Sequence, residues 1–479
     1  DCGCFRRVHC LLLDWLGKRL FLLERKRVGM VAELGSGLTH EEIQAAEGLL
    51  RFIDESPSAF HAVSALRARF DEAGFVFLPE AQTWSCKPGG RYYTVRNGSS
   101  IIAFKVGSAV SEGYHFQITA SHSDSPLFKI KAQPALEGPG SYRRLNVEAY
   151  GGMIDYTWFD RPLSLAGRVM VQIGNRIESR LVSLDRDVAL IPSLAIHMNH
   201  GVNNGFAPNR RIDLCPVVST GALEKEALQP LLANELDLHP DQIVSHDLYL
   251  VNRQAPCIWG AAGEFISAPR LDDLMCAYAS AEAFLRSAND SCVSVYCCFD
   301  NEEVGSNTKQ GAMSTFLPDT LMRLNGALGG TDEEYRRALA GSLLVSCDNA
   351  HAVHPNHPEK SDEGNRAYLN QGIVVKEAAN QKYCTDAFSS AVFCAVCNNA
   401  SVPFQRFANR SDMAGGSTLG NLSNIQASMH GVDVGCAQLA MHSAYETAGA
   451  RDVMLATRAL LAFFDADIQI SGADSATLR

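Results

Sequence analysis

The chain lacks a hydrophobic run long enough to cross a membrane, which takes about 18 consecutive apolar residues. The nearest candidate, residues 10–23, is interrupted by Asp14, Lys18 and Arg19. We therefore predict no integral membrane segment. Residues 1–35 are expected to form an N-terminal extension of unknown role, either a helix that packs on the rest of the chain or a non-native leader. A targeting segment or a membrane-surface helix is the alternative.

The sequence also lacks an excess of positive charge and a regular cysteine pattern. The formal net charge is −11 and the sequence pI is about 5.7. A general nucleic-acid binder normally presents a basic face, so we predict no nucleic-acid partner. The 15 cysteines are odd in number and follow no repeated spacing. This argues against a disulfide framework and favours a reducing, cytoplasmic setting.

Apolar residues make up 46% of the 479 residues, enough for large cores, and this length is typical of two or three domains. Strand-like runs occur at 92–95, 100–104, 116–120, 293–299 and 343–347. Helical periodicity occurs at 43–53, 57–75, 275–285 and 453–464. The alternation predicts an α/β fold, with a mainly parallel sheet flanked by helices. Between about 130 and 256, alternating apolar runs and one expected helix at 223–236 indicate an inserted β-rich unit.

Five short segments place acidic or imidazole side chains just beyond predicted strands. In the first, His122 follows the run 116–120, and Asp124 stands two residues further on. Such a histidine can bind a metal while a carboxylate fixes its tautomer, although an ordinary loop histidine is the alternative. In the second, Asp272 and Asp273 could equally cap the helix that follows them.

The third segment places Asp300, Glu302 and Glu303 directly after the apolar run 293–299. Three carboxylates in four residues would repel one another unless a cation neutralised them, so we favour a functional site over a solvated loop.

In the fourth segment, Asp348 ends the run 343–347 and is followed by His351 and His354. In the fifth, His442 follows an expected strand at 432–434. A mixed imidazole and carboxylate set without a thiolate motif suits zinc, or cobalt or manganese by availability. Two such ions bridged by one carboxylate would activate a water, while adjacent glutamates bind metal and move protons separately.

These segments belong to a longer series of motifs. The series comprises Ser121-His-Ser-Asp-Ser-Pro126, Tyr150-Gly-Gly152, Thr157-Trp-Phe-Asp-Arg161, Leu194-Ala-Ile-His197, Pro269-Arg-Leu-Asp272, Asp300-Asn-Glu-Glu-Val-Gly-Ser306, His351-Ala-Val-His-Pro355 and Gln438-Leu-Ala-Met-His-Ser443. In this order, and over about residues 40–465, the chain closely resembles the aspartyl aminopeptidase family of dinuclear zinc exopeptidases.

The resemblance implies two zinc ions per subunit, with Co²⁺ or Mn²⁺ as substitutes. His122 and Asp348 would hold the first ion, Glu303 and His442 the second, and Asp272 would bridge them. It also implies a discontinuous catalytic domain, an inserted dimerisation domain and a dodecamer built from dimers. The catalytic domain would comprise residues 36–129 and 257–479, and the dimerisation domain residues 130–256.

The implied activity is removal of N-terminal Asp or Glu from peptides. Glu302 would be the general base, and Asp124 would orient His122. The residues that we assign to substrate binding are His197 of a neighbouring subunit, Lys376, His351 and His354.

Two departures from the family leave the fine specificity open. Ala414-Gly415 stands where the family commonly has Pro-Cys, and Tyr445 stands near a family arginine. The alternatives are a self-assembling scaffold, a broader-specificity metalloaminopeptidase or a related metal-dependent deacylase.

Overall fold

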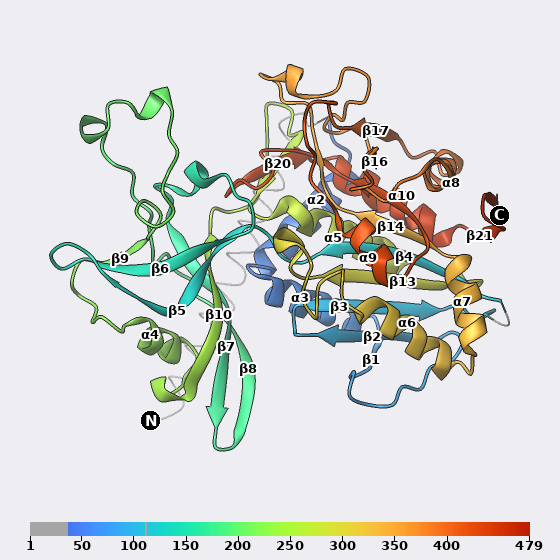
Figure 1. Cartoon of the computed structure of the whole chain (residues 1–479), viewed down its shortest axis with the longest axis horizontal. Coiled ribbons are helices and arrows are strands. Elements are labelled where there is room, and N and C mark those ends of the chain that lie inside the picture. Colours follow the sequence, from blue (N-terminus) through green and yellow to red (C-terminus); the bar gives the residue numbers. More distant parts are fainter. Residues whose placement is uncertain (1–36, 111–112) are drawn as a thin grey trace, which may run out of the picture.

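The structure is a computed structural model that describes residues 37–110 and 113–479. The extension predicted at 1–35 lies outside these residues. Figure 1 shows two parts side by side, a helix-flanked sheet and a smaller β-rich part formed by the middle of the chain. Among the described helices, none is both long and apolar enough to span a bilayer.

A nine-stranded sheet forms the centre of the larger part. Its strands, in spatial order, are β1 (Val76–Phe77), β2 (Arg91–Arg96), β3 (Ser100–Val106), β13 (Val293–Phe299), β4 (Phe116–His122), β14 (Leu343–Cys347), β18 (His430–Gly435), β16 (Ile373–Glu377) and β17 (Phe404–Ala408). Five of the eight neighbouring pairs are parallel, including β13–β4, β4–β14 and β14–β18. The mainly parallel sheet predicted from the sequence is confirmed.

Helices cover both faces of this sheet. One face is covered by α2 (His40–Glu55), α3 (Ala59–Glu72), α5 (Leu271–Arg286), α8 (Ala387–Asn399) and α10 (Asp452–Asp465). The other is covered by α6 (Phe316–Ala327), α7 (Asp332–Ala340) and α9 (Leu419–Gln426). Strand β13 shows why two layers are needed: Tyr296 and Cys298 enter the first core, whereas Val295 and Cys297 enter the second.

The β-rich part contains a six-stranded antiparallel sheet. Its order is β8 (Arg176–Ser183), β7 (Leu163–Ile173), β10 (Ile243–Asn252), β5 (Leu127–Glu137), β6 (Arg143–Tyr150) and β9 (Val217–Ser219). Short 3-10 turns lie at η1 (Asp155–Trp158), η2 (Ile196–Met198), η3 (Val202–Asn204) and η4 (Pro240–Gln242).

The helix expected at 223–236 was predicted too long, because α4 spans only Leu228–Glu235. The Ser219 hydroxyl accepts hydrogen bonds from the N–H groups of Gly221 and Leu223, at 3.1 Å each, and so holds the preceding residues in a turn.

A five-stranded sheet lies beside the carboxyl ends of the central strands. Its order is β11 (Cys257–Trp259), β12 (Phe265–Ala268), β20 (Glu446–Gly449), β19 (Ala437–Leu439) and β15 (Ala350–His351). The remaining elements are η5 (Glu302–Val304), η6 (Pro358–Lys360), β21 (Ile468–Ser471) and β22 (Ser475–Leu478). The strand expected at 432–434 lies within β18, and His442 follows it after the short strand β19 of this second sheet, with φ of 68°.

Candidate functional site

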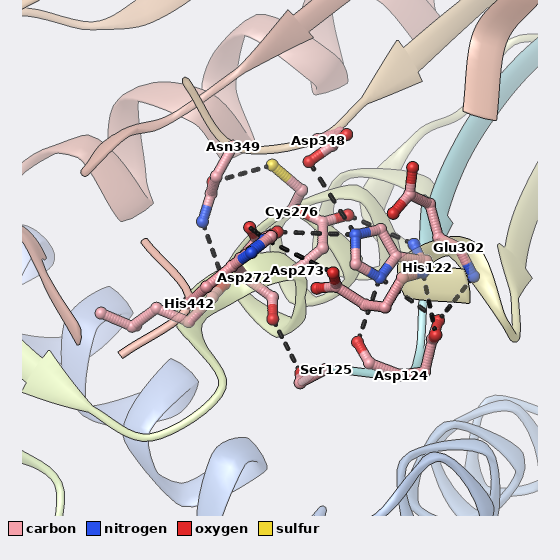
Figure 2. Close-up of polar contacts among 12 residues, drawn as sticks. His122, Asp124, Ser125, Asp272, Asp273, Cys276, Glu302, Asp348, Asn349 and His442 are labelled. Atoms are coloured by element: carbon pink, nitrogen blue, oxygen red, sulfur yellow. Dashed lines mark hydrogen bonds and ion pairs between the residues drawn. The ribbon is translucent and has the colours of Figure 1, made fainter. Parts of the chain in front are cut away.

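The predicted site residues meet at one edge of the central sheet. Strands β13, β4 and β14 are parallel neighbours, so their carboxyl ends lie together. His122 ends β4, Glu302 and Glu303 follow β13, and Asp348 follows β14. Figure 2 shows Asp272, from the start of α5, lying between His122 and His442.

The carboxylate of Asp272 contacts both imidazoles, one through each oxygen. Its Oδ1 lies 3.5 Å from His122 Nε2, and its Oδ2 lies 3.4 Å from His442 Nε2. A carboxylate in this position can bridge two cations.

Two groups of metal-ligating atoms share Asp272. The first also contains His122, Asp273 and Asp348, and the ligand atoms within it lie within 4.8 Å of one another. The second group also contains Glu303 and His442, with 3.4 Å between Glu303 Oε2 and His442 Nε2. The imidazole and carboxylate composition suits zinc.

Within residues 37–110 and 113–479, three buried carboxylate oxygens of this cluster have no hydrogen-bond partner. They are Asp272 Oδ1, Asp273 Oδ1 and Glu303 Oε1. A buried oxygen without a partner costs free energy, unless a cation compensates it. The residues present therefore fit bound metal ions.

The pKa values reflect the same crowding of negative charge. Burial raises the pKa of Glu302 to about 8; His122 opposes this shift, and the Asp348 carboxylate adds to it. Burial and the neighbouring Asp272 raise the pKa of Glu303 well above its ordinary value. Burial also disfavours the charged form of Asp272, but its contacts with both imidazoles outweigh burial and lower its pKa. A divalent cation would relieve this repulsion.

Asp124 connects the two loops that carry His122 and the glutamates. Its backbone carbonyl lies 3.0 Å and its Oδ1 3.4 Å from His122 Nδ1. Its carboxylate accepts hydrogen bonds from the N–H groups of Glu302 and Glu303, at 3.1 and 3.2 Å, and from the Tyr150 hydroxyl at 2.7 Å. Asp124 thus fixes the orientation of one imidazole and the position of both glutamates.

Glu446, which the sequence did not single out, has a similar place on the opposite side. Its Oε2 accepts a hydrogen bond from the Asp272 N–H at 3.0 Å, and its Oε1 accepts one from the His442 N–H at 2.6 Å. The side chain is buried, and burial raises its pKa to about 8 with Asp272 adding to the shift. The one feature of the sequence that could have indicated this role is that Glu446 stands four residues after His442.

Lys376 is buried behind Asp348. Its ammonium donates to the carbonyl oxygens of Asp348 at 2.7 Å and Asn349 at 3.3 Å, and it lies 3.9 Å from Asp348 Oδ2. Burial alone would lower its pKa, but the surrounding acidic groups, with Asp348 first among them, together outweigh burial and raise it.

The three histidines that the sequence assigned to substrate binding are exposed. His351 lies in β15, with its ring 6.4 Å from the Phe407 ring, and His354 lies with its ring 5.2 Å from that of His357. His197 lies in η2, between β8 and β9 of the β-rich part.

The chain is similar to known proteins over most of its length. The family described as "Aminopeptidase I zinc metalloprotease (M18)" matches residues 52–464. The "Probable M18 family aminopeptidase 2" of Clostridium acetobutylicum is 42% identical over 429 residues, covering 88% of this chain and 99% of that protein. The protein of the same description from Pseudomonas fluorescens is 40% identical over 424 residues, covering 87% and 97%.

Solved structures of similar chains share the fold. A chain of the Ape4 and Nbr1 complex superposes with a TM-score of 0.87 at 35% identity, covering 90% of this chain and 87% of that one. The S. cerevisiae mApe1 dodecamer gives a TM-score of 0.79 at 27% identity, covering 89% and 97%. The resemblance found in the sequence is confirmed: the chain belongs to the M18 family of zinc metalloproteases and is an aminopeptidase.

Proposed function

We propose that the enzyme removes N-terminal Asp or Glu from peptides at a two-zinc centre, with Glu302 as the general base. The observation that carries this proposal is the position of Asp272, whose two oxygens face His122 and His442 in separate donor groups.

The proposed ligands follow from these groups. His122 and Asp348 would hold one zinc ion, Glu303 and His442 the other, and Asp272 would bridge them, with Co²⁺ or Mn²⁺ as substitutes. When bound, zinc lowers the pKa of a water and polarises a peptide carbonyl. The partnerless oxygens of Asp272 and Glu303 support this assignment.

Glu302 would move the proton. One of its carboxylate oxygens lies within 4.8 Å of ligand atoms of His122 and Glu303. Its backbone N–H donates a hydrogen bond to Asp124 Oδ1. From this position its carboxylate takes the proton of the attacking water and passes it to the leaving amine. Asp124 acts as a positioning residue, because its contacts are to the residues that carry the chemistry.

Recognition of an acidic side chain would rest on Lys376. In the described part of the chain its ammonium donates to two carbonyl oxygens and lies 3.9 Å from Asp348 Oδ2, so a substrate carboxylate would reach its third N–H group beside the Asp348 carboxylate. His351 and His354 would line the approach to the site, and His197 would enter it from a neighbouring subunit.

The proposal includes a homo-oligomer, a dodecamer built from dimers, supported by the dodecameric S. cerevisiae mApe1. It also includes a cytoplasmic setting, which the free cysteines of the described residues support.

A Glu302→Gln variant tests the mechanism. We expect the variant to keep two zinc ions per chain by elemental analysis and to lose about 10²- to 10⁴-fold in kcat. Glu363→Gln, which changes an exposed carboxylate, is the matched control. Full activity in the Glu302 variant would show that another group is the base, and one zinc per wild-type chain would disprove the two-zinc centre.

A panel of Asp, Glu, Ala and Leu chromogenic amides, with and without chelator, tests the specificity. We expect activity on the acidic substrates and its loss on chelation. A preference for Leu would disprove the acidic specificity, and activity indifferent to the chelator would disprove the metal mechanism.

A further inference from the structure

Strand β8 is a free edge of the six-stranded sheet. Within the described residues it pairs with β7 alone, and it ends the strand order. Figure 1 shows the β7–β8 hairpin extending beyond the rest of the β-rich part. A free edge with open N–H and C=O groups is a template for pairing with another strand.

The register identifies which backbone groups of β8 are open. Leu184 donates its N–H to the carbonyl of Leu165, and the pairing with β7 continues without a bulge to Arg176. Backbone groups in an antiparallel strand point alternately to its two sides. The even-numbered residues therefore bond to β7, and Ile177, Ser179 and Leu181 direct their N–H and C=O groups to the free edge.

The side chains of β8 carry a self-complementary pattern. Ile177 and Leu181 lie on one face, 60% and 37% exposed, with the exposed Ser179 between them. Glu178 and Arg180 lie on the other face. The strand thus has an apolar residue two positions before and after Ser179, and opposite charges one position before and after it.

We propose that β8 pairs antiparallel with β8 of a second copy of this chain, about a two-fold axis through Ser179. In this register Ile177 lies opposite the partner's Leu181, and Glu178 lies opposite the partner's Arg180. The two-fold axis repeats each pair, and the outward N–H and C=O groups of Ile177, Ser179 and Leu181 are all bonded. Cross-strand apolar and opposite-charge pairs stabilise a sheet.

The neighbouring registers are disfavoured by charge. An axis through Glu178 would place this carboxylate opposite its own copy, and an axis through Arg180 would place the guanidinium opposite its own copy. Like charges directly opposite one another destabilise paired strands. Among these three registers, the charges therefore favour the axis through Ser179.

This inference rests on the homo-oligomer proposed above and names one of its contacts. A Ser179→Cys variant tests the register, because only the residue on the axis meets its own copy. Directly opposite residues of a hydrogen-bonded pair have Cα atoms about 5.5 Å apart, within disulfide reach. Ile177→Cys is the matched control, since residue 177 and its copy are offset by four positions, about 13 Å along the strand.

We expect a disulfide-linked dimer of Ser179→Cys on a non-reducing gel after mild oxidation, and no more than the wild-type background for Ile177→Cys. Equal cross-linking of both variants, or none for Ser179→Cys in an oligomeric protein, would overturn the β8 contact. A monomeric wild type in sedimentation would overturn the oligomer as well. The zinc chemistry is tested separately and is unaffected by either outcome.

Charge exchange gives an independent test in solution. Glu178→Arg and Arg180→Glu each place like charges across the axis, and each should sediment as a smaller species than the wild type. The double exchange restores opposite pairs and should restore the wild-type mass. An exchange at the ion pair of half-buried Glu47 and exposed Arg51 on α2 is the control. Single variants that keep the wild-type mass while remaining folded by circular dichroism would contradict the proposal.

Discussion

Replacing Glu446 by alanine would remove the one side chain that accepts hydrogen bonds from the backbones of both Asp272 and His442. Both N–H groups would then be left in the interior without their acceptor. An unsatisfied buried donor costs about 1–3 kcal/mol, so the free energy of unfolding should fall by about 2–6 kcal/mol. Glu446→Gln keeps one carbonyl oxygen and should cost about half as much.

The same change should weaken metal binding unequally. Of the two backbones that Glu446 holds, Asp272 belongs to both donor groups, whereas His442 belongs to that of Glu303 and not to that of His122 and Asp348. Loss of a residue that supports metal ligands typically costs 10- to 100-fold in metal affinity, so one of two zinc ions should be released about that much more readily.

Urea unfolding of the metal-depleted protein measures the first effect, and zinc release to a chromogenic chelator measures the second. Glu363→Ala, at an exposed carboxylate, is the control for general effects of mutation. If Glu446→Ala unfolds within about 0.5 kcal/mol of the wild type, the size of an ordinary surface substitution, Glu446 does not stabilise the fold through these two N–H groups. Equal acceleration of zinc release from both positions would refute the assignment of Glu446 to one of them.

Two further predictions concern charged side chains. Lys376→Met should lower kcat/KM for Asp and Glu substrates by about 30-fold or more, because truncating a buried charge partner costs about 2–5 kcal/mol. The variant should change kcat/KM for Ala substrates little. An equal loss for all substrates would show that Lys376 acts only through Asp348. Burial lowers the pKa of His61 from 6.5 to about 4, with Arg270 adding to the shift. Below pH 6.5 the unfolded chain therefore binds a proton at His61 that the folded chain does not, and the free energy of unfolding falls towards pH 4. His61→Gln should therefore show a smaller shift of the urea midpoint between pH 7 and 5 than the wild type, and an unchanged shift would contradict this cause.

Local patterns were sufficient to predict the central strands. The runs 293–299 and 343–347 coincide with β13 and β14, because both strands are buried along their whole length and contain few polar residues. The acids that follow such strands could be expected at one edge of a parallel sheet. The sequence alone therefore predicts Glu302 and Asp348 as site residues.

Contacts between distant segments could not be predicted in the same way. His442 follows a short strand of a different sheet from the one that carries His122. Its backbone is left-handed, and no local sequence pattern predicts that conformation for a histidine. Glu446 acts through backbone groups of Asp272, a contact that joins positions 174 residues apart. A lone glutamate in a strand carries no local mark of such a contact.

The connection between β4 and its parallel neighbours has a consequence for the order of folding. Strand β4 ends at His122, and its partners β13 and β14 begin only at Val293 and Leu343. The intervening chain forms the antiparallel sheet, whose hairpin strands are close in sequence and are expected to pair earlier than parallel strands. During synthesis, the β-rich part can therefore be complete while the cluster still lacks Asp348 and His442. A growing chain would have no peptidase activity until nearly its whole length had been made.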